Sequence, residues 1–370
     1  MEPVKKSPAA ITGIGLVTVL GQSADETFAA LLAGQSISDH RKIPGYTGPL
    51  RIIAMAERAA AEALSHSRWP PSLRASPDTA LIVATSKGTI ESWIESKGSG
   101  VFSKTPDPFD FCGLSELARS LANEFHFGSG PRLTISSACS SGLHALARAV
   151  LAVESGEARR ALVVAADASV HPLFISSFKR LGILAPEGHG CRPFDHNRAG
   201  FIISEAAAAL CVESLDHATA PPLAKIDAWA LASDAAHLTG CDPNALALKK
   251  MLHRIAPPDL DLIHAHATGT HLNDPVELSA LSTLNFNSHP ILYSHKAALG
   301  HSLGAAGLIS AVINCLCHIH GKIPANIRSP NPLPMPLLRF PHNPVDHPIH
   351  KSLALAAGFA GPLAAVRFST

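Results

Sequence analysis

Short runs of β-branched and apolar residues alternate along this chain with longer Ala- and Leu-rich stretches of helical spacing. The short runs predict strands at residues 10–12, 80–84, 162–165, 262–265 and 291–293. The longer stretches predict helices at residues 23–33, 52–65, 115–125, 140–156, 243–255, 274–283 and 303–318. Such alternation is typical of α/β proteins, in which helices pack on the faces of a largely parallel sheet.

Composition excludes several function classes. Hydrophobic residues make up 46% of the 370 residues and charged residues only 16%, so the chain has ample material for a large core and is not disordered. Thirty Lys and Arg against 29 Asp and Glu leave a formal charge of +1, which gives no field to hold nucleic acid or an anionic membrane. Few charges on an Ala-rich chain predict close packing of small side chains and a face buried in a dimer.

The chain shows no flexible linker between autonomous domains. A Pro-rich stretch at residues 218–223 lies near the middle, and strand-to-helix turns recur on both sides of it. We therefore expect two similar halves, residues 1–215 and 216–370, packed as one body. No export signal follows the N-terminal lysines, and the apolar runs are shorter than the ~20 residues that a membrane-spanning helix needs, so we expect a cytoplasmic protein without membrane insertion.

The sharpest local feature surrounds Cys139, in the sequence TISSACSSGLHAL at residues 134–146. An extended run meets small residues there and leads into a helix, so Cys139 is expected at a helix N-terminus. The helix dipole and unpaired amides at that place favour a thiolate. A buried structural cysteine is the alternative, but the small neighbours leave room for a substrate to approach.

Two further motifs follow predicted strands in the second half. The first, HAHATGTHLNDPVE at residues 264–277, places His266 and its threonines on a loop after a strand. The second, SHKAALGHSLGAAG at residues 294–307, leads from a strand into a glycine-punctuated helix start. His264, His266 and His271 could instead be metal ligands, although strand geometry and a glycine turn separate His271 from the other two.

Together the three motifs resemble those of the β-ketoacyl synthases of the thiolase superfamily. The family carries its cysteine in a motif like T-A-C-S-S-G, one histidine in H-G-T-G-T-x-L-N-D-P-x-E and another in K-x-x-x-G-H-x-x-G-A-A-G, and this chain has all three in that order. Residues 11–18, 192–195 and 358–361 extend the similarity over nearly the whole chain. The resemblance implies a thiolase-like α/β fold, with two similar βαβ halves stacked as a five-layered α-β-α-β-α body, and a dimer.

The resemblance also implies catalytic roles. Cys139 would be the nucleophile that accepts an acyl group, and His266 and His301 would hydrogen-bond the malonyl thioester oxygen where enolate charge develops. The amides of Cys139 and Phe359 would form an oxyanion hole. Lys296 would tune and orient the region of the second histidine, or be a buried ion-pair partner without a catalytic role.

Further residues are assigned to binding and support by the same resemblance. Thr268 and Thr270 would hold a phosphopantetheine arm, and Phe359 would gate the acyl pocket. Asp274 and Glu277 would anchor the histidine loop. No metal or nucleotide cofactor is implied, because the substrates arrive on the phosphopantetheine of an acyl carrier protein.

The implied activity is decarboxylative Claisen condensation in fatty-acid or polyketide- and polyene-type biosynthesis, by a homodimer or by a heterodimer with another ketosynthase. One alternative is a chain-length-factor-like partner subunit with little condensing activity of its own. Such subunits usually lack the cysteine, which this chain retains. A second alternative is thioester hydrolysis or non-decarboxylative transfer by the same cysteine, which would need only one histidine.

The chain also departs from the family pattern at glycine positions. His266 is followed by Ala267, and the closing loop has Ala360 where the family has glycine. The segment at residues 198–208 lacks an acid and three glycines of the family pattern. Alanine adds bulk and is unfavourable wherever φ is positive, so we expect these loops to be reshaped or less mobile.

Overall fold

A ten-stranded sheet organises the protein, as seen in a computed structural model that describes residues 8–98 and 113–370. Its strand order is β3-β2-β4-β5-β1-β6-β12-β11-β7-β8. The strands are β1 (Ala9–Thr18), β2 (Thr79–Ala84), β3 (Arg132–Ile135), β4 (Arg160–Asp167), β5 (Ala206–Ser214), β6 (Ala224–Ser233), β7 (Leu262–His264), β8 (Ile291–Tyr293), β11 (Lys351–Ala357) and β12 (Pro362–Ser369), and a separate pair is formed by β9 (Lys322–Ile323) and β10 (Val345–Asp346).

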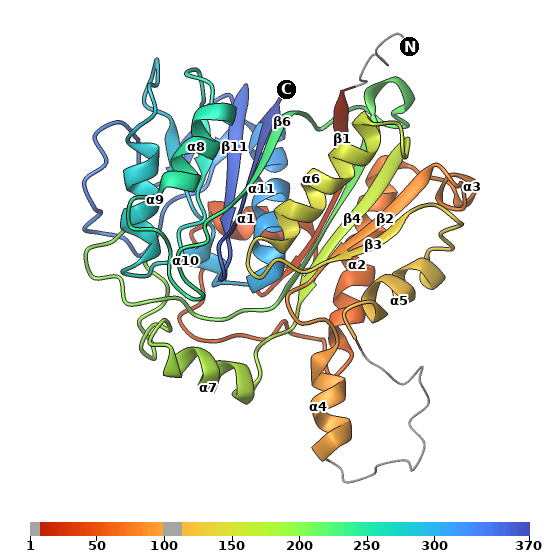
Figure 1. The fold of residues 1–370 in the computed structure, drawn as a ribbon, viewed down its shortest axis with the longest axis horizontal. Coiled ribbons are helices and arrows are strands. Elements are labelled where there is room, and N and C mark those ends of the chain that lie inside the picture. Colours follow the sequence, from red (N-terminus) through yellow and green to blue (C-terminus); the bar gives the residue numbers. More distant parts are fainter. Residues whose placement is uncertain (1–7, 99–112) are drawn as a thin grey trace.

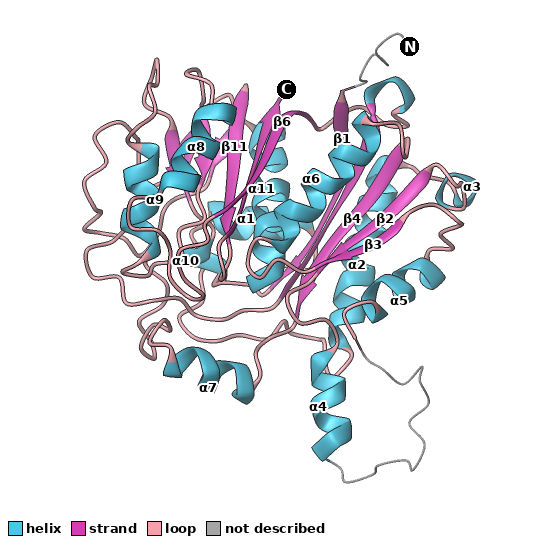
Figure 2. Cartoon of the chain, viewed as in Figure 1, coloured by secondary structure: helices cyan, strands magenta, loops and turns pink. Residues whose placement is uncertain are grey.

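Helices connect and cover these strands (Figure 2). They are α1 (Ala24–Leu32), α2 (Arg51–Ser67), α3 (Pro71–Arg74), α4 (Ile90–Gly98), α5 (Glu116–Glu124), α6 (Ser141–Glu154), α7 (Pro172–Arg180), α8 (Leu246–Ile255), α9 (Asn273–Leu281), α10 (Lys296–Leu299) and α11 (Ala306–His320), with 3₁₀ turns η1 (Leu215–His217) and η2 (Leu303–Ala305).

The sheet consists of two halves with the same connectivity. In the first half β1 pairs antiparallel with β5, β5 antiparallel with β4, β4 parallel with β2, and β2 parallel with β3. In the second half β6, β12, β11, β7 and β8 repeat this pattern in the same sequential order. Only Ala9, Ala10 and Ile11 of β1 pair with β6, so a short seam joins the halves.

Helices and half-sheets form five layers (Figure 1), and hydrophobic clusters fill the space between them. Helices α2 and α5 cover the outer face of the first half-sheet, and α8 and α9 cover that of the second. Helices α6 and α11 lie between the half-sheets and share one cluster with both of them. The predicted thiolase-like, five-layered fold is confirmed.

Strands that are buried on both faces explain the continuous apolar runs in the sequence. Along β4, Val163 faces the central cluster while its neighbours Leu162 and Val164 face the outer one. Parallel strands covered by helices on both sides need this composition. The predicted strands all form, and most predicted helices shift by only a few residues at their ends.

Small residues let the central helices approach closely, as the composition predicts. A Cβ at Gly142 of α6 would stand 2.6 Å from the backbone nitrogen of Leu308 in α11, and one at Gly307 of α11 would stand 3.0 Å from the backbone nitrogen of Leu143 in α6. Helix α11 and the preceding 3₁₀ turn are apolar over a length that could cross a membrane, but 89% of this segment is buried inside the protein. The segment is therefore packed as a core helix.

Candidate active site

The three sequence motifs meet at the carboxyl ends of strands. Cys139 follows β3, His266 follows β7, His301 follows β8, and Phe359 follows β11. All four line one pocket of about 180 Å³, together with Thr268 and other residues. Open α/β sheets place their ligand sites at this edge, where loops from several strands converge.

Cys139 lies on a tight turn immediately before α6. Ala138 has a φ of 48°, in the left-handed region, and hydrogen bonds then close the turn. Ser140 Oγ donates to the Ser137 carbonyl at 2.7 Å, and Ser141 Oγ donates to the Ala138 carbonyl at 2.6 Å. Ser140 therefore braces the turn and does not cap the helix, whereas Ser23 does cap α1, by accepting from the Glu26 amide at 3.2 Å.

The thiol of Cys139 is protonated at neutral pH. Burial raises its pKa to about 11, against the opposing effect of the positive charges on Lys87 and Lys296. The expectation of a preformed thiolate is therefore wrong for the resting site. Acyl transfer to Cys139 needs a group that takes the thiol proton.

Two buried carboxylates hold the loop that carries His266. Glu277 accepts hydrogen bonds from the amides of His266 and Ala267, at 2.6 and 2.8 Å. Asp274 accepts from the Gly269 amide at 3.1 Å and from the amide of Phe194 at 2.7 Å. Burial raises the pKa of both carboxyl groups, that of Asp274 to about 7, and the amide donors oppose this rise.

His266 and His301 lie next to each other in the lining of the pocket, with ring centroids 5.7 Å apart and ring planes at 80°. The backbone of His301 is fixed by its amide, which donates to the Ile202 carbonyl at 2.8 Å. Burial lowers the pKa of both imidazoles well below the usual value, and the charge of Lys296 adds to the effect. Both rings are therefore neutral at pH 7, when each can donate one hydrogen bond and accept another.

Lys296 lies behind the pocket, buried to 1% exposure, and does not line it. Its ammonium donates to the carbonyl of His266. Lys296 is predicted to tune and orient the region of the second histidine, and the direct contact of its ammonium is with the first. Its charge adds to burial in lowering the pKa of His301, and its carbonyl accepts a hydrogen bond from the amide of Gly300, the residue before His301, at 3.0 Å.

A third histidine of the motif, His264, points away from this site into the core. Its Nε2 lies 2.9 Å from His295 Nδ1, and both residues are fully buried. Within the described ranges no three His, Cys, Asp or Glu side chains gather as a metal site.

The loop of Phe359 lies against the cysteine turn. A Cβ on Gly358 would stand 2.8 Å from the Ser137 carbonyl oxygen and 3.2 Å from Ala138 Cβ, so glycine is needed for this approach. Within the described part of the chain the Phe359 amide donates to no other group. A free N–H beside the nucleophile is what an oxyanion hole requires.

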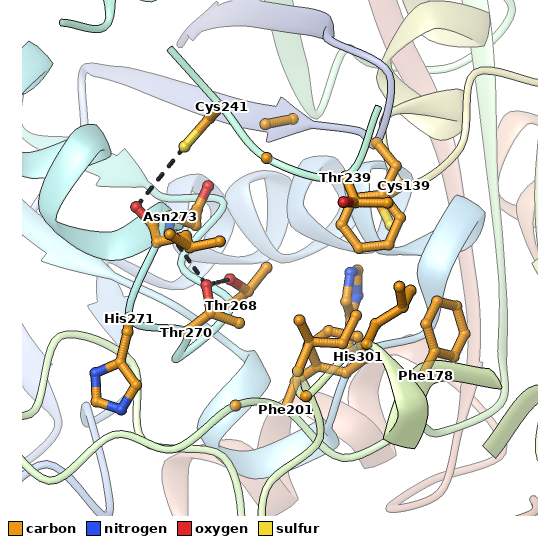
Figure 3. A pocket seen from close by; sticks show the side chains of 18 of the residues that line it. Cys139, Phe178, Phe201, Thr239, Cys241, Thr268, Thr270, His271, Asn273 and His301 are labelled. Atoms are coloured by element: carbon orange, nitrogen blue, oxygen red, sulfur yellow. Dashed lines mark hydrogen bonds between the residues drawn. The ribbon is translucent and has the colours of Figure 1, made fainter. Parts of the chain in front are cut away.

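Polar groups gather on one side of the pocket and aromatic rings on the other (Figure 3). Thr268 Oγ1 and Thr270 Oγ1 are 3.0 Å apart, and Thr270 Oγ1 accepts from the Asn273 amide at 3.1 Å. Phe201 meets the ring of His301 edge-on at a centroid distance of 4.9 Å, and Phe178 lies 5.9 Å from Phe201.

Sequence reasoning missed several of these lining residues. Phe178 lies on α7, which no helical prediction covered, and Thr239 and Cys241 come from a loop without a recognisable motif. Phe201 could have been found from the sequence, since it stands in the segment at 198–208 that departs from the family pattern.

Alanine occupies left-handed backbone positions in two site loops. Ala267 has a φ of 43° and Ala360 a φ of 65°. At these two residues the chain keeps a glycine-like conformation despite the added Cβ, so the replacement by alanine appears as local strain. At Ala267 and Ala360, therefore, the backbone is not reshaped as expected, because both residues keep a positive φ.

Comparison with known proteins supports the same reading. Residues 51–218 match the family described as beta-ketoacyl synthase, N-terminal domain, and residues 223–329 match its C-terminal domain. The chain is 29% identical over 364 residues to the 3-oxoacyl-[acyl-carrier-protein] synthase 2 of Mycobacterium leprae, covering 87% of this chain and 86% of that protein. It is 32% identical over 269 residues to a putative polyketide beta-ketoacyl synthase 1 of Streptomyces cyaneus, covering 68% of this chain and 63% of that protein.

Solved structures agree in fold over almost the whole length. One matching chain comes from a type II polyketide complex, in which an acyl-carrier protein binds its ketosynthase, bound to the hexaketide. It superposes with a TM-score of 0.88 at 25% identity, and the match covers 99% of this chain and 100% of that one. The ishigamide ketosynthase/chain length factor superposes with a TM-score of 0.88 at 26% identity, covering 99% of each. With the cysteine, the two histidines and the fold in place, this chain belongs to the β-ketoacyl synthase family.

Proposed function

We propose that this protein catalyses decarboxylative Claisen condensation between an acyl group on Cys139 and a malonyl thioester. One observation carries the proposal: the half-buried thiol of Cys139 shares a single pocket with two neutral histidines and a free backbone amide. A nucleophile, two hydrogen-bond donors and an oxyanion site are the parts that this reaction needs.

In the first step the Cys139 sulfur attacks the carbonyl of an acyl thioester. The thiol proton passes to a neutral imidazole in the pocket, and the carbon–sulfur bond of the incoming thioester breaks. The carrier leaves as a thiol and the acyl group stays on Cys139. The amides of Cys139 and Phe359 would stabilise the tetrahedral oxyanion.

In the second step a malonyl thioester loses CO₂, and its electron pair moves into an enolate. His266 and His301 would donate hydrogen bonds to the enolate oxygen, which their neutral state at pH 7 allows. The enolate carbon attacks the acyl carbonyl, the bond to Cys139 breaks, and a β-ketoacyl thioester leaves. The released Cys139 thiolate takes up a proton from water, which restores the resting thiol.

An acyl carrier protein is the proposed partner that delivers both substrates. Thr268 and Thr270 line the polar side of the pocket and would hold the phosphopantetheine arm. One solved relative is a ketosynthase in complex with its acyl-carrier protein, which supports this choice.

A dimer is proposed through the edge of the first half-sheet. Strand β3 stands at the end of the strand order and is partly exposed, whereas its neighbour β2 is fully buried. The Pro131 carbonyl accepts a hydrogen bond from Leu81 of β2, and the Ile135 carbonyl accepts one from Thr85, the residue after β2. By the two-residue period of a strand, the backbone groups of Thr134 therefore point outward. An edge with unpaired groups is suited to pair with a second copy.

A partner-subunit role is the second candidate, and one observation favours it. Alanine replaces glycine at strained positions beside both His266 and Phe359, which a subunit without turnover tolerates. Another solved relative combines a ketosynthase with a chain length factor. Retention of Cys139 and both histidines favours the condensing role.

The proposal is tested by measuring condensation with the purified chain alone and after its co-expression with a second ketosynthase of the family. Release of CO₂ from malonyl carrier protein should fall by a factor on the order of 10² or more in His266→Ala and in His301→Ala, the scale of losing one oxyanion donor. A co-expressed pair that loses its product only when the partner's cysteine is replaced would assign this chain to the partner-subunit role.

A further inference from the structure

Lys87 places a positive charge beside the pocket that the proposed reaction does not use. The residue follows β2, in a sequence that lacks the spacing of a phosphate-binding loop. Its Nζ stands 5.0 Å from the ring centroid of Phe174 and 5.5 Å from that of Phe178. Because Phe178 lines the pocket, Lys87 is one side chain away from it.

The ammonium of Lys87 makes few direct contacts, and the buried carboxyl of Asp167 lies near it: burial raises the pKa of Asp167, and the charge of Lys87 opposes this rise. Nζ donates one hydrogen bond, to Ser86 Oγ at 3.1 Å. The nearby carboxylate of Asp167 is occupied by other donors, namely Ser86 Oγ at 3.0 Å and the Gly304 amide at 2.7 Å. Within residues 8–98 and 113–370, no carboxylate oxygen lies within the 4.0 Å of Lys87 Nζ that defines an ion pair. An ammonium has three donors, and within the described residues only one of them is used in a hydrogen bond.

The charge of Lys87 reaches the reaction centre. Among the charged groups that lower the pKa of Cys139, Lys87 has the largest effect, ahead of Lys296. It also lowers the pKa of His301. The electrostatic reach of Lys87 therefore covers the space around the Cys139 sulfur, where a bound acyl chain begins.

Aromatic side chains form the boundary between Lys87 and that space. Phe178 lies 6.3 Å from Phe359 and 5.9 Å from Phe201, in centroid distance. An acyl chain that extends past Phe178 approaches the ammonium. A hydrocarbon chain there would remove water from a charge without replacing its hydrogen bonds, which is unfavourable. An oxygen on the chain would instead accept a charge-assisted hydrogen bond.

We propose that Lys87 determines acyl specificity and selects chains that carry a hydrogen-bond-accepting oxygen beyond the thioester, as a ketone or a terminal carboxylate. This inference rests on the proposed function, since it concerns the acyl group that Cys139 accepts. Lys87 is a specificity residue, and the chemistry of acyl transfer stays with Cys139 and the histidines.

Acylation of Cys139 by three carrier-protein thioesters of equal chain length tests this assignment. The probes are hexanoyl, 3-oxohexanoyl and 5-carboxypentanoyl thioesters, and intact-protein mass spectrometry follows the adduct. The wild type should accept at least one oxygenated chain faster than hexanoyl by about tenfold, the factor expected for one charge-assisted hydrogen bond. The 3-oxo and carboxyl arms show which oxygen is recognised.

Variants at Lys87 separate specificity from reactivity. Lys87→Met keeps the length of the side chain without the charge, and it should remove the preference or reverse it in favour of hexanoyl. Lys87→Arg keeps the charge and should keep the preference. Circular dichroism and thermal unfolding report whether each variant remains folded, independently of the charge effect of Lys87 on the thiol.

Three results would overturn the inference. A wild type that prefers hexanoyl contradicts it without need of any variant. A Lys87→Met protein in which all three rates change by the same factor shows that Lys87 acts only on the thiol through its charge. A wild type that forms no Cys139 adduct with any probe overturns the proposed function as well, so the two failures are distinguishable.

Discussion

Cys139 and its two histidines are all uncharged at neutral pH, which fixes how the site starts its reaction. The thiol has a raised pKa and both imidazoles have lowered ones, and burial is the largest cause in each case. A neutral imidazole can accept the thiol proton when the acyl thioester arrives. Nucleophile activation is thus coupled to substrate binding in this account.

The pH dependence of Cys139 alkylation follows from the raised pKa. With a pKa of about 11, only about one thiol in 10⁴ is ionised at pH 7, so the rate of alkylation by iodoacetamide should rise steadily with pH to beyond pH 9. Cys139→Ala is the control for alkylation at other cysteines. A rate that reaches its plateau at or below pH 7.5 would show a preformed thiolate and contradict the assignment.

Among the single elements of the fold, the loop that carries His266 is held in place by the carboxylate of Glu277. Each carboxylate oxygen of Glu277 accepts one backbone amide, from His266 and Ala267. In Glu277→Gln an NH₂ group replaces one acceptor and faces an amide donor, so the free energy of unfolding should fall by about 1–3 kcal/mol, the cost of one unsatisfied buried group. Urea denaturation measures this change.

The same variant should also move His266. Malonyl decarboxylation is expected to fall in Glu277→Gln by more than Cys139 acylation falls. An equal loss of both would indicate a general structural role for Glu277, without specific control of the histidine.

An alanine with a positive φ in a site loop is a position where substitution by glycine should stabilise the protein. Ala360 has a φ of 65°, where an L-residue is strained by about 1–2 kcal/mol. Glycine would relieve this strain, but its greater conformational entropy in the unfolded state offsets part of the stabilisation. Ala360→Gly should therefore stabilise the protein by roughly 0.5–1 kcal/mol in thermal or urea unfolding. Ala29→Gly, in exposed helical conformation in α1, is the matched control and should destabilise by about 1 kcal/mol. Destabilisation in both variants would show that Ala360 is not strained.

The sequence is most informative where chemistry is local. The motifs around Cys139, His266 and His301 predict the site because each follows a strand, and strand ends meet at one edge. The sequence is least informative where packing against neighbouring elements determines the secondary structure. Ala206–Ser214 forms a central strand although alanine has low strand propensity, because β1 and β4 flank it and helices cover both faces. The pocket positions of Phe178 and Cys241 likewise depend on loops whose course no local pattern gives.

At the scale of the whole molecule, the repeated connectivity explains how the site is assembled. The loops after β3 and β8, which are equivalent strands of the two half-sheets, carry Cys139 and His301 respectively. The loops after β2 and β7 carry Lys87 and His266 in the same way. We propose that residues 1–215 and 216–370 are copies of one unit, divided at the turn η1 between β5 and β6, and that one copy supplies the nucleophile while the other supplies the histidines.

Assembly through β3 gives a prediction for the intact protein. Thr134→Pro removes an outward-facing N–H from the edge strand and leaves pairing with β2 in place, so it should convert a dimer into monomers. Light scattering after size-exclusion chromatography measures the mass, and Thr134→Val, which keeps the N–H, is the control. A dimer that persists in Thr134→Pro would move the interface elsewhere.

The central claim is that Cys139 carries the acyl group and passes it to a malonyl-derived carbanion. Intact-protein mass spectrometry tests both halves in one sequence, first with acyl carrier-protein thioester alone and then after addition of malonyl carrier protein. We predict an adduct on Cys139 in the first stage that disappears in the second as a β-ketoacyl carrier protein forms, and no adduct in Cys139→Ala. An adduct that malonyl carrier protein fails to discharge, or that forms on another cysteine, would contradict the account.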